Sequence, residues 1–350
     1  MNKISRRVLL GSIPVGIIAL ATYRHEDSVA QNASGVVNLY SARHYDTDNI
    51  IYQAFTKKTG IKVNLVEADA AKLIERIKSE GRNSPADVIL TVDAGNLYRA
   101  QAEGLLQPVK SRLLETRIPS NLREPSGLWF GLTKRARVIM FNKDKVNPAM
   151  LSTYEDLASP RWRGKVITRS STHVYNQSLV ASMVASNGVK KSEDWIKRFV
   201  ANFARPPEGN DTAQIRAVAA GVADLAVVNT YYLPRLAKSN KPEDRQVAAK
   251  IGVFFPNQNN RGTHINISGA GVAKNAPNRA AAIKFIEYLT EYESQRIFAS
   301  NNNEYPVLRG VPLDPILGSY GQFKEDEVSA VELGRNNKTA IQIMDRGGWR

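Results

Sequence analysis

Strand-like and helix-like stretches alternate from residue 35 to about residue 104, and this alternation limits the possible folds more than any other feature of the sequence. Three short apolar stretches have the length of buried strands, and each is followed by a stretch with apolar residues at helical spacing. The predicted strands are 35–41, 61–69 and 86–92, and the predicted helices are 46–58, 70–80 and 95–104. Strands that alternate with helices are typical of βαβ units, so the sequence predicts an α/β protein built on a parallel sheet.

The rest of the chain predicts a second lobe. Its long extended segments and further helices are 128–143 (extended), 174–188 (helix), 223–230 (strand), 266–276 (extended) and 279–299 (one amphipathic helix), with a helical tail after Pro315. Ser171 or Thr172 is expected to be the N-cap of the helix at 174–188. Extended segments that cross between two α/β lobes indicate a two-lobed fold whose lobes are discontinuous in sequence. Such proteins bind a ligand in the cleft and close about a hinge.

The first thirty residues predict an export signal. They combine basic residues with a weakly apolar stretch, and residues 28–30 (SVA) have the small–x–Ala form of a cleavage site. Residues 5–10 (SRRVLL) resemble a twin-arginine signal. An uncleaved membrane anchor is the alternative, but the apolar stretch is short and is interrupted by glycine, serine and proline. We therefore expect export by the twin-arginine machinery, cleavage after Ala30 and a periplasmic location.

Composition excludes several classes of function. The chain has no cysteine, which excludes disulfides, thiolate metal sites and cysteine nucleophiles. Its net charge of +15 could attract nucleic acid, but the basic residues are scattered and form no recognisable nucleic-acid module. The sequence has no P-loop, no HExxH, no dinucleotide fingerprint and no convincing Ser-His-Asp order. We expect neither nucleic-acid binding nor enzymatic activity.

Chemically distinctive side chains follow the predicted strands. In open α/β sheets the ligand lies beyond the carboxyl ends of the strands. The relevant strand ends are Ser41, Val92, Thr168 and Asn229, and the residues that follow them include His44, Tyr45, Asp93, His173, Tyr175, Tyr231 and Tyr232. The stretch NTYYLPRL at 229–236 places two phenols just before an arginine. With 13 tyrosines in the chain, such a pair alone is close to chance; tyrosines at three of the four strand ends make a site the better interpretation.

Several phenols at one place suggest a hard trivalent cation such as Fe³⁺, because softer sites use thiolate or imidazole ligands. A free phenol has a pKa near 10, but a bound trivalent cation favours the ionised form. Four phenolates around Fe³⁺ leave a net charge of −1, which a guanidinium would offset. Arg235 is the nearest candidate in sequence, and Arg135 and Arg137 are others.

Six stretches together resemble the ferric-iron-binding proteins of ABC importers, which are two-lobed solute-binding proteins. They are YSARHYD (40–46), SPADVIL (84–90), TKRARV (133–138), SPRWRGKV (159–166), NTYYLPRL (229–236) and NEYPV (303–307). The resemblance covers nearly the whole chain after residue 30. It implies a periplasmic-binding-protein-like α/β fold of class II with extended hinge strands. We expect a first lobe of 31–134 plus 262–306 and a second lobe of 135–261 plus 307–350.

The resemblance also implies a ligand set. It makes Tyr231 and Tyr232 iron ligands and His44 a candidate ligand. Some members have a carboxylate after the SPADV strand, where this chain has Asp93 one position later. Tyr45 and Tyr175 instead resemble the tyrosine-rich, cyanobacterial-type branch, which needs no carboxylate ligand and leaves either His44 or water to complete the coordination.

The expected role is that of a monomeric periplasmic receptor that binds Fe³⁺ and passes it to an inner-membrane permease. Fe²⁺ is expected to bind more weakly, and Arg135 and Arg235 are expected to support the site electrostatically. The alternative is a solute-binding protein for a small anion or oxyanion, held by Arg135, Arg137, Arg235 and the helix N-termini near Ser171 and Asp211.

Overall fold

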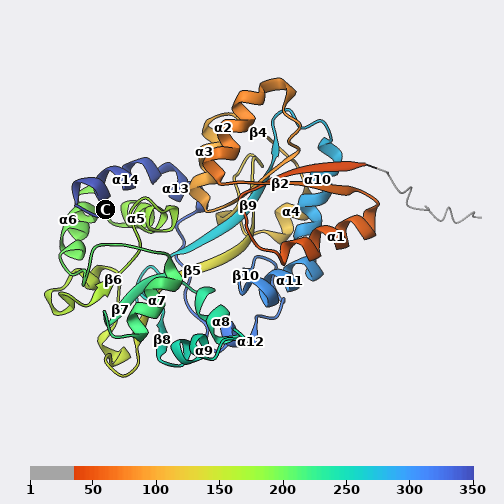
Figure 1. The fold of residues 1–350 in the computed structure, drawn as a ribbon. Helices are drawn as coiled ribbons and strands as arrows, with labels where there is room; N and C mark the ends of the chain where they lie inside the picture. Colours follow the sequence, from red (N-terminus) through yellow and green to blue (C-terminus); the bar gives the residue numbers. More distant parts are fainter. Residues whose placement is uncertain (1–34) are drawn as a thin grey trace, which may run out of the picture. The chain divides into compact units, whose positions relative to one another are not determined.

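The computed structural model describes residues 35–350, so the predicted signal at 1–30 lies outside the described residues. Within 35–350 no helix has the length and apolar character needed to cross a bilayer. Ten strands form one hydrogen-bonded network whose main path runs in the order β2-β1-β3-β9-β5-β7-β6 (Figure 1).

The first lobe is built on β1, β2 and β3, which are parallel as predicted. The strands of this lobe are β1 (Val36–Ser41), β2 (Lys62–Glu67), β3 (Val88–Val92), β4 (Leu106–Gln107), β9 (Ile265–Ala273) and β10 (Tyr305–Pro306). The sheet is mixed rather than wholly parallel, because β9 returns from the second lobe and pairs antiparallel with β3. The carboxyl end of β3 therefore lies beside β9, and the carboxyl end of β1 lies one strand further from it.

Helices cover both faces of this sheet. They are α1 (Asp48–Thr59), α2 (Ala70–Glu80), α3 (Ala94–Ala102), α4 (Arg112–Arg117), α10 (Arg279–Leu289) and α11 (Tyr292–Asn302). The single helix predicted at 279–299 is wrong, because the chain breaks at Thr290 and Glu291, where Glu291 has an extended backbone. The buried Gln295 amide donates to the carbonyls of Leu132 and Leu289, which fixes the start of α11 against the preceding helix. Local apolar spacing could not reveal this long-range contact.

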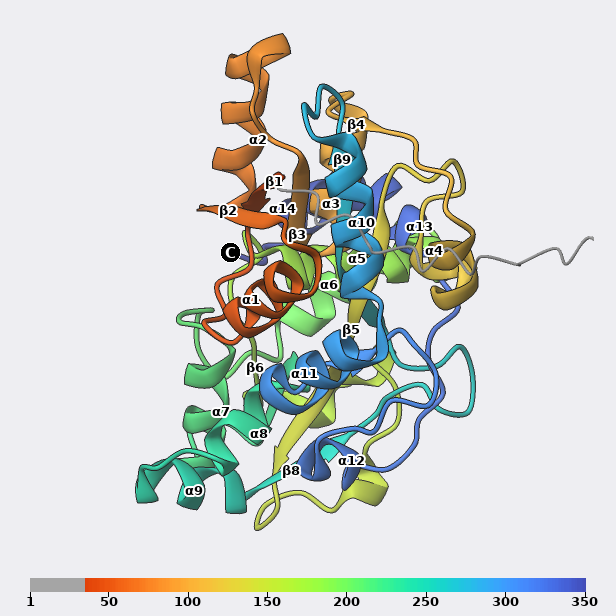
Figure 2. The same ribbon diagram turned by 90° about the vertical axis from the view of Figure 1, so that its right-hand side faces the viewer.

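The long strand β5 (Phe130–Asn142) belongs to both lobes. Residues 130–136 pair with β9, and residues 137–142 pair with β7 (Leu225–Asn229) and β8 (Ile251–Phe254). The change of partner falls between Ala136 and Arg137. Figures 1 and 2 show β5 running from one group of elements to the other. This strand confirms the predicted extended crossing.

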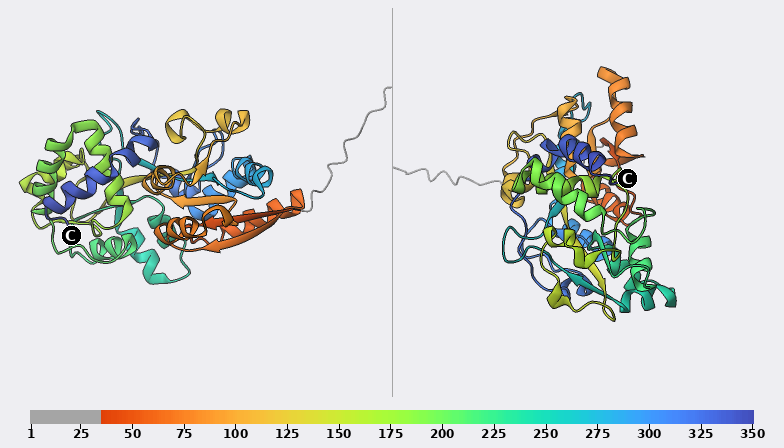
Figure 3. Two further views of the ribbon diagram at one scale, coloured as in Figure 1. Left: turned by 90° about the horizontal axis from the view of Figure 1, so that it is seen from above. Right: turned by 90° about the vertical axis from the view of Figure 1, so that its left-hand side faces the viewer.

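The second lobe has helices on both faces of a small sheet, which β6 (Val166–Ile167) completes parallel to β7. Alternate residues of β5 and β7 point to opposite faces. One face contacts α5 (Val174–Asn187), α6 (Val189–Val200) and α14 (Asn337–Arg346), as Figure 3 shows from two further directions. The other face contacts α7 (Asp211–Ala219), α8 (Tyr232–Ala237) and α9 (Pro242–Ala249). Short 3₁₀ segments lie at Gly81–Asn83, Ser120–Leu122, Pro148–Met150, Glu155–Ala158 and Pro160–Trp162.

The helical tail predicted after Pro315 is present as α12 (Pro315–Gly318), α13 (Ala330–Arg335) and α14. Helix α12 contacts α8, and α14 packs on α5 and α6. Helix α13 contacts both α3 and α5, so it touches elements predicted for different lobes. The residue bounds of the two lobes stay a prediction.

Candidate metal-binding site

A pocket of about 420 Å³ lies at the carboxyl ends of the strands, where the sequence predicted the ligand. Most of the predicted site residues line it. Those present in its wall are His44, Tyr45, Tyr175, Tyr231, Tyr232 and Arg235, together with Ala42, Asp69, Ala70, Ala71, Val92, Asn96, Thr172, His173 and Val174. Four tyrosines from three separate segments of the chain therefore surround one space. No cluster of three or more histidine and carboxylate side chains suited to a metal occurs in residues 35–350.

The loop between β1 and α1 presents Tyr45. Behind it the buried guanidinium of Arg43 pairs with Asp48 over 2.7 Å and with Glu304 over 2.9 Å. The same guanidinium lies 4.6 Å from the centre of the Tyr45 ring. Two carboxylates on one arginine fix the guanidinium in place, so the Tyr45 ring rests on a rigid support. His44 is exposed at the rim of the pocket.

Tyr175 lies in the first turn of α5, which begins at Val174 as predicted but has a different N-cap. The N-cap is His173 rather than Ser171 or Thr172, because its Nδ1 accepts a hydrogen bond from the Tyr175 amide over 3.3 Å. Loop 169–172 is held by side chains of the helix that follows it. The Asn176 amide donates to the carbonyls at 169 and 170, and the Gln177 amide donates to those at 171 and 172.

The adjacent phenols follow β7 directly. Tyr231 is the N-cap of α8 and Tyr232 its first residue, so the chain turns between strand and helix as both rings enter the site. The two ring centres are 4.4 Å apart. Pro234 lies in the first turn of α8, where its missing N–H removes no helical hydrogen bond. The stretch NTYYLPRL therefore runs from the end of β7 into a short helix.

The phenol oxygens of different segments meet in the pocket. The Tyr231 hydroxyl donates a hydrogen bond to the Tyr175 hydroxyl over 2.9 Å, and the Asn229 amide donates to Tyr231 over 3.3 Å. These contacts join the end of β7 to the start of α5. Tyr231 is fully buried, so its hydroxyl has no access to solvent that would replace these partners.

Arg235 projects from α8 onto the rings. Its guanidinium carbon lies 4.8 Å from the ring centres of Tyr45 and Tyr231 and 5.6 Å from that of Tyr232. One of its terminal nitrogens is buried and has no hydrogen-bond partner. An N–H group without a partner at this position is well placed to interact with an anionic oxygen.

The two hinge arginines differ. Arg137 donates to Asp211 at 3.1 Å, to Asn229 at 3.1 Å and to Asn176 at 2.7 Å, so it joins α7, β7 and α5, and only its Nε is buried without a partner. Arg135 lies 5.3 Å from the centre of the Tyr175 ring, and two of its buried nitrogens have no hydrogen-bond partner. Arg135 therefore keeps more unpaired N–H groups next to the phenols than Arg137 does.

Burial favours the neutral forms of several side chains at the site. Burial raises the pKa of the Tyr45 phenol to about 12, and it also raises the pKa of the Tyr231 and Tyr232 phenols above their usual value. Burial and the neighbouring arginines lower the pKa of His173 to about 3, so its imidazole is neutral. Neutral phenols become ligands only if a cation supplies the energy to ionise them. The arrangement suits an ion of high charge.

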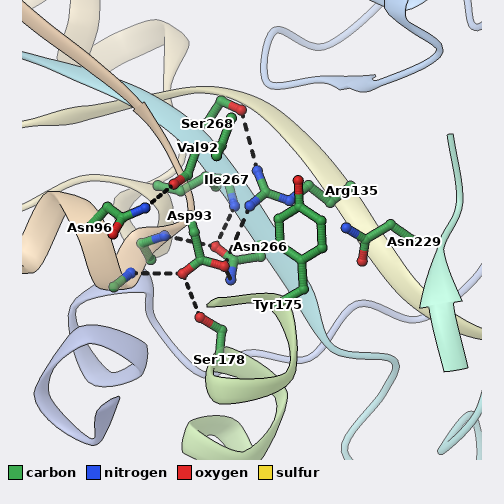
Figure 4. A network of polar contacts seen from close by, with 12 residues as sticks. Val92, Asp93, Asn96, Arg135, Tyr175, Ser178, Asn229, Asn266, Ile267 and Ser268 are labelled. Atoms are coloured by element: carbon green, nitrogen blue, oxygen red, sulfur yellow. Dashed lines mark hydrogen bonds and ion pairs between the residues drawn. The ribbon is translucent and has the colours of Figure 1, made fainter. Parts of the chain in front are cut away.

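Asp93 does not line the pocket. Figure 4 shows its carboxylate turned to a network beneath Tyr175, where it accepts hydrogen bonds from the Ser178 hydroxyl and the Asn266 amide and faces Arg135. The Asp93 carboxylate, which comes one position later than the carboxylate of some family members, thus joins a buried hydrogen-bond network outside the pocket.

Two residues near the phenols were not foreseen from the sequence as parts of the site. They are Arg43 and Glu304, which form the support behind Tyr45. His173, which the sequence placed after a strand end, lies edge-on against Tyr175 with ring centres 4.2 Å apart. Arg43 and Glu304 both occur in stretches that carry the family resemblance, which is the only signal that could have indicated them. Their pairing spans 261 residues and leaves no local pattern.

Known proteins resemble this chain over most of its length. Residues 51–325 match the family model described as bacterial extracellular solute-binding protein. "Iron uptake protein A1" of Synechocystis sp. is 53% identical over 100% of both chains, and the "Fe(3+)-binding periplasmic protein" of Serratia marcescens is 28% identical over 96% of this chain and 97% of that protein.

Solved structures extend the comparison. A Trichodesmium protein (IdiA, FutA), solved in complex with iron and citrate, is 61% identical with a TM-score of 0.88, covering 90% of this chain and 100% of that chain. The ferric binding protein of Campylobacter jejuni is 44% identical with a TM-score of 0.86 over the same shares. The two-lobed α/β fold is therefore confirmed, and the chain belongs to the family of bacterial extracellular solute-binding proteins, in the group that includes these iron uptake and ferric-binding proteins.

Proposed function

We propose that this protein is the periplasmic binding component of an ABC iron importer, which binds Fe³⁺ in the cleft between its lobes and delivers it to a membrane permease. One observation carries the proposal: Tyr45, Tyr175, Tyr231 and Tyr232 line a single pocket beside Arg235. The iron-binding relatives support the same ligand. The role is binding and transfer, without catalysis, and the protein acts as a monomer exported by the twin-arginine machinery.

The proposed ligands come from both lobes. Tyr45 belongs to the predicted first lobe, and Tyr175, Tyr231 and Tyr232 belong to the predicted second lobe. An ion held by phenolates from both sides favours the closed arrangement, because only that arrangement offers every ligand. His44 at the rim or a water molecule completes the coordination.

Charge determines both binding and release. Four phenolates and one Fe³⁺ carry a net charge of −1, and Arg235 and Arg135 lie close enough to offset it. Fe²⁺ brings less charge to ionise phenols, so it is held more weakly. Reduction by an external one-electron donor is therefore the proposed release step: the iron leaves as Fe²⁺, the phenolates take up protons, and Arg235 moves toward the phenol oxygens as the metal charge falls.

Titration of the iron-free protein with Fe³⁺ tests the proposal. A visible phenolate–iron absorption band that saturates at one iron per chain is expected. Absence of the band at micromolar protein and iron would refute the metal assignment.

An anion is the second candidate ligand, and the buried guanidinium nitrogens of Arg135 and Arg235 without partners favour it. Phosphate, sulfate and citrate, each added without iron, distinguish the two. Tight binding of one of them to the iron-free protein, together with no absorption band on iron addition, would establish the anion instead.

A further inference from the structure

The carboxylate of Asp93 lies where elements of both lobes meet. It is fully buried at the N-terminus of α3, and its partners come from four different elements. One oxygen accepts from the Gly95 amide of α3 over 2.9 Å and from the Ser178 hydroxyl of α5 over 2.5 Å. The other accepts from the Asn266 side chain of β9 over 2.8 Å and lies 3.6 Å from Arg135 of β5. No other residue drawn in Figure 4 joins as many elements.

Ser178 connects this carboxylate to the candidate site. It lies three residues after Tyr175 on α5, so the two side chains project from neighbouring positions on the same side of the helix. Ser178 is fully buried, and Asp93 is the acceptor of its hydroxyl. Arg135, the cation that faces Asp93, lies over the Tyr175 ring. Two chains of contact therefore connect Asp93 to Tyr175: one through Ser178 on α5, and one through Arg135.

The backbone at Asp93 indicates that these contacts hold it in place. Its φ of 81° is one that non-glycine residues rarely adopt, and such a conformation persists only where the surroundings determine it. A buried carboxylate also needs its donors, because each one removed leaves charge without compensation. Loss of the Ser178 hydroxyl would leave one Asp93 oxygen with the Gly95 amide alone.

We infer that Asp93 and Ser178 form a latch between the lobes that positions Tyr175 for the bound ion. The inference rests on the proposed function, since it concerns how long the iron-loaded closed state lasts. Asp93 and Ser178 do not touch the ion in this arrangement; they are positioning residues. The latch fixes the start of α5 relative to α3, so breaking it lets Tyr175 move away from Tyr45 without altering any phenol.

The rate of iron release tests the latch. Ser178→Ala removes the hydroxyl and keeps the helix, and Ser182→Ala is the matched control, because Ser182 is equally buried one turn later and donates to the Leu179 carbonyl inside α5. Release into excess chelator is followed by loss of the phenolate–iron band in stopped flow. A hydrogen bond to a charged group typically contributes about 1.5–3 kcal/mol, so Ser178→Ala should release iron roughly 10- to 150-fold faster. Ser182→Ala should stay within about twofold of wild type.

Two further measurements separate a latch from general stability. The melting temperature of the iron-free variants shows whether Ser178→Ala merely weakens the fold; a latch predicts faster release than in a control variant of equal melting temperature. Asp93→Asn removes the charge from the acceptor and should also release iron faster, and the double variant should release it no faster than the faster single variant, because both changes weaken the same contact.

The outcomes are distinct. Equal release from Ser178→Ala and Ser182→Ala would overturn the latch, as would rate increases that simply multiply in the double variant. Absence of any iron band in the wild-type protein would instead refute the proposed function itself.

Discussion

The hydroxyl of Tyr231 lies 2.9 Å from the hydroxyl of Tyr175, although 56 residues separate them in the chain. This hydrogen bond, donated by Tyr231 to Tyr175, joins the end of β7 to the start of α5 inside the pocket. An ion that ionises both phenols would take the place of this hydrogen bond.

Replacing either phenol should therefore greatly reduce iron affinity. Tyr175→Phe and Tyr231→Phe each remove one anionic ligand, and we expect a loss of more than about 100-fold, since even outer partners of metal ligands contribute 10- to 100-fold. Tyr292→Phe is the control, because Tyr292 is 47% exposed and lies outside the pocket. Competition against a chelator of known affinity measures all three. Unchanged affinity in both site variants would contradict the ligand set.

Arg235 should contribute through its charge. Arg235→Gln leaves the anionic phenolate–iron cluster without its nearest cation, and we expect iron affinity to fall roughly 10- to 100-fold. Arg235→Lys keeps the charge but loses the planar group over the rings, so its loss should be smaller. The same competition assay ranks the variants; equal losses in the two would show that charge is not the property that matters.

Iron affinity should rise with pH. Burial raises the pKa of the Tyr45, Tyr231 and Tyr232 phenols, so they are protonated in the iron-free protein at neutral pH. Each phenolate formed on binding releases a proton, and affinity changes by up to about tenfold per pH unit for each proton released. Titration in weakly buffered solution with a pH indicator counts the protons. Each Tyr→Phe variant should release one proton fewer, and a count that did not change would argue against that phenol as a ligand.

Acid should destabilise the fold through His264. This residue is 2% exposed, and burial together with Arg261, Arg137 and Arg135 holds its pKa well below the usual value. The unfolded chain binds a proton near pH 6.5 while the folded chain does not, so stability is complete above pH 6.5 and falls as the pH drops below it. His264 contributes at most about 1.4 kcal/mol per pH unit to this slope, and His173, whose pKa is also lowered, contributes in the same direction.

Denaturant unfolding at pH 7.5, 6.5 and 5.5 measures this slope. His264→Gln should reduce the slope between pH 6.5 and 5.5 without removing it, because His173 also has a lowered pKa, whereas His44→Gln, at an exposed position, should leave the slope intact. The same slope in the wild type and in His264→Gln would exclude His264 as the source.

The sequence predicted local features better than distant ones. The parallel strands β1 to β3 and the crossing strand β5 follow from apolar runs of suitable length, and the positions of Tyr45 and Tyr231 follow from the rule about strand ends. The break between α10 and α11 could not be predicted, because it depends on Gln295 contacting a carbonyl 163 residues away. The support that Arg43 and Glu304 give to Tyr45 was missed for the same reason.

The sharing of β5 between the sheets bears on how the chain folds. Val88 pairs with Val272, and Phe130 pairs with Ala270, so the first sheet is incomplete until residues far along the chain have been made. Such distant pairing slows folding, because a long loop must close before the contact forms. A fragment that ended before β9 would expose the unpaired edges of β3 and β5, and exposed edges promote aggregation. Neither lobe is expected to fold alone when expressed separately, and the protein should unfold as a single cooperative unit.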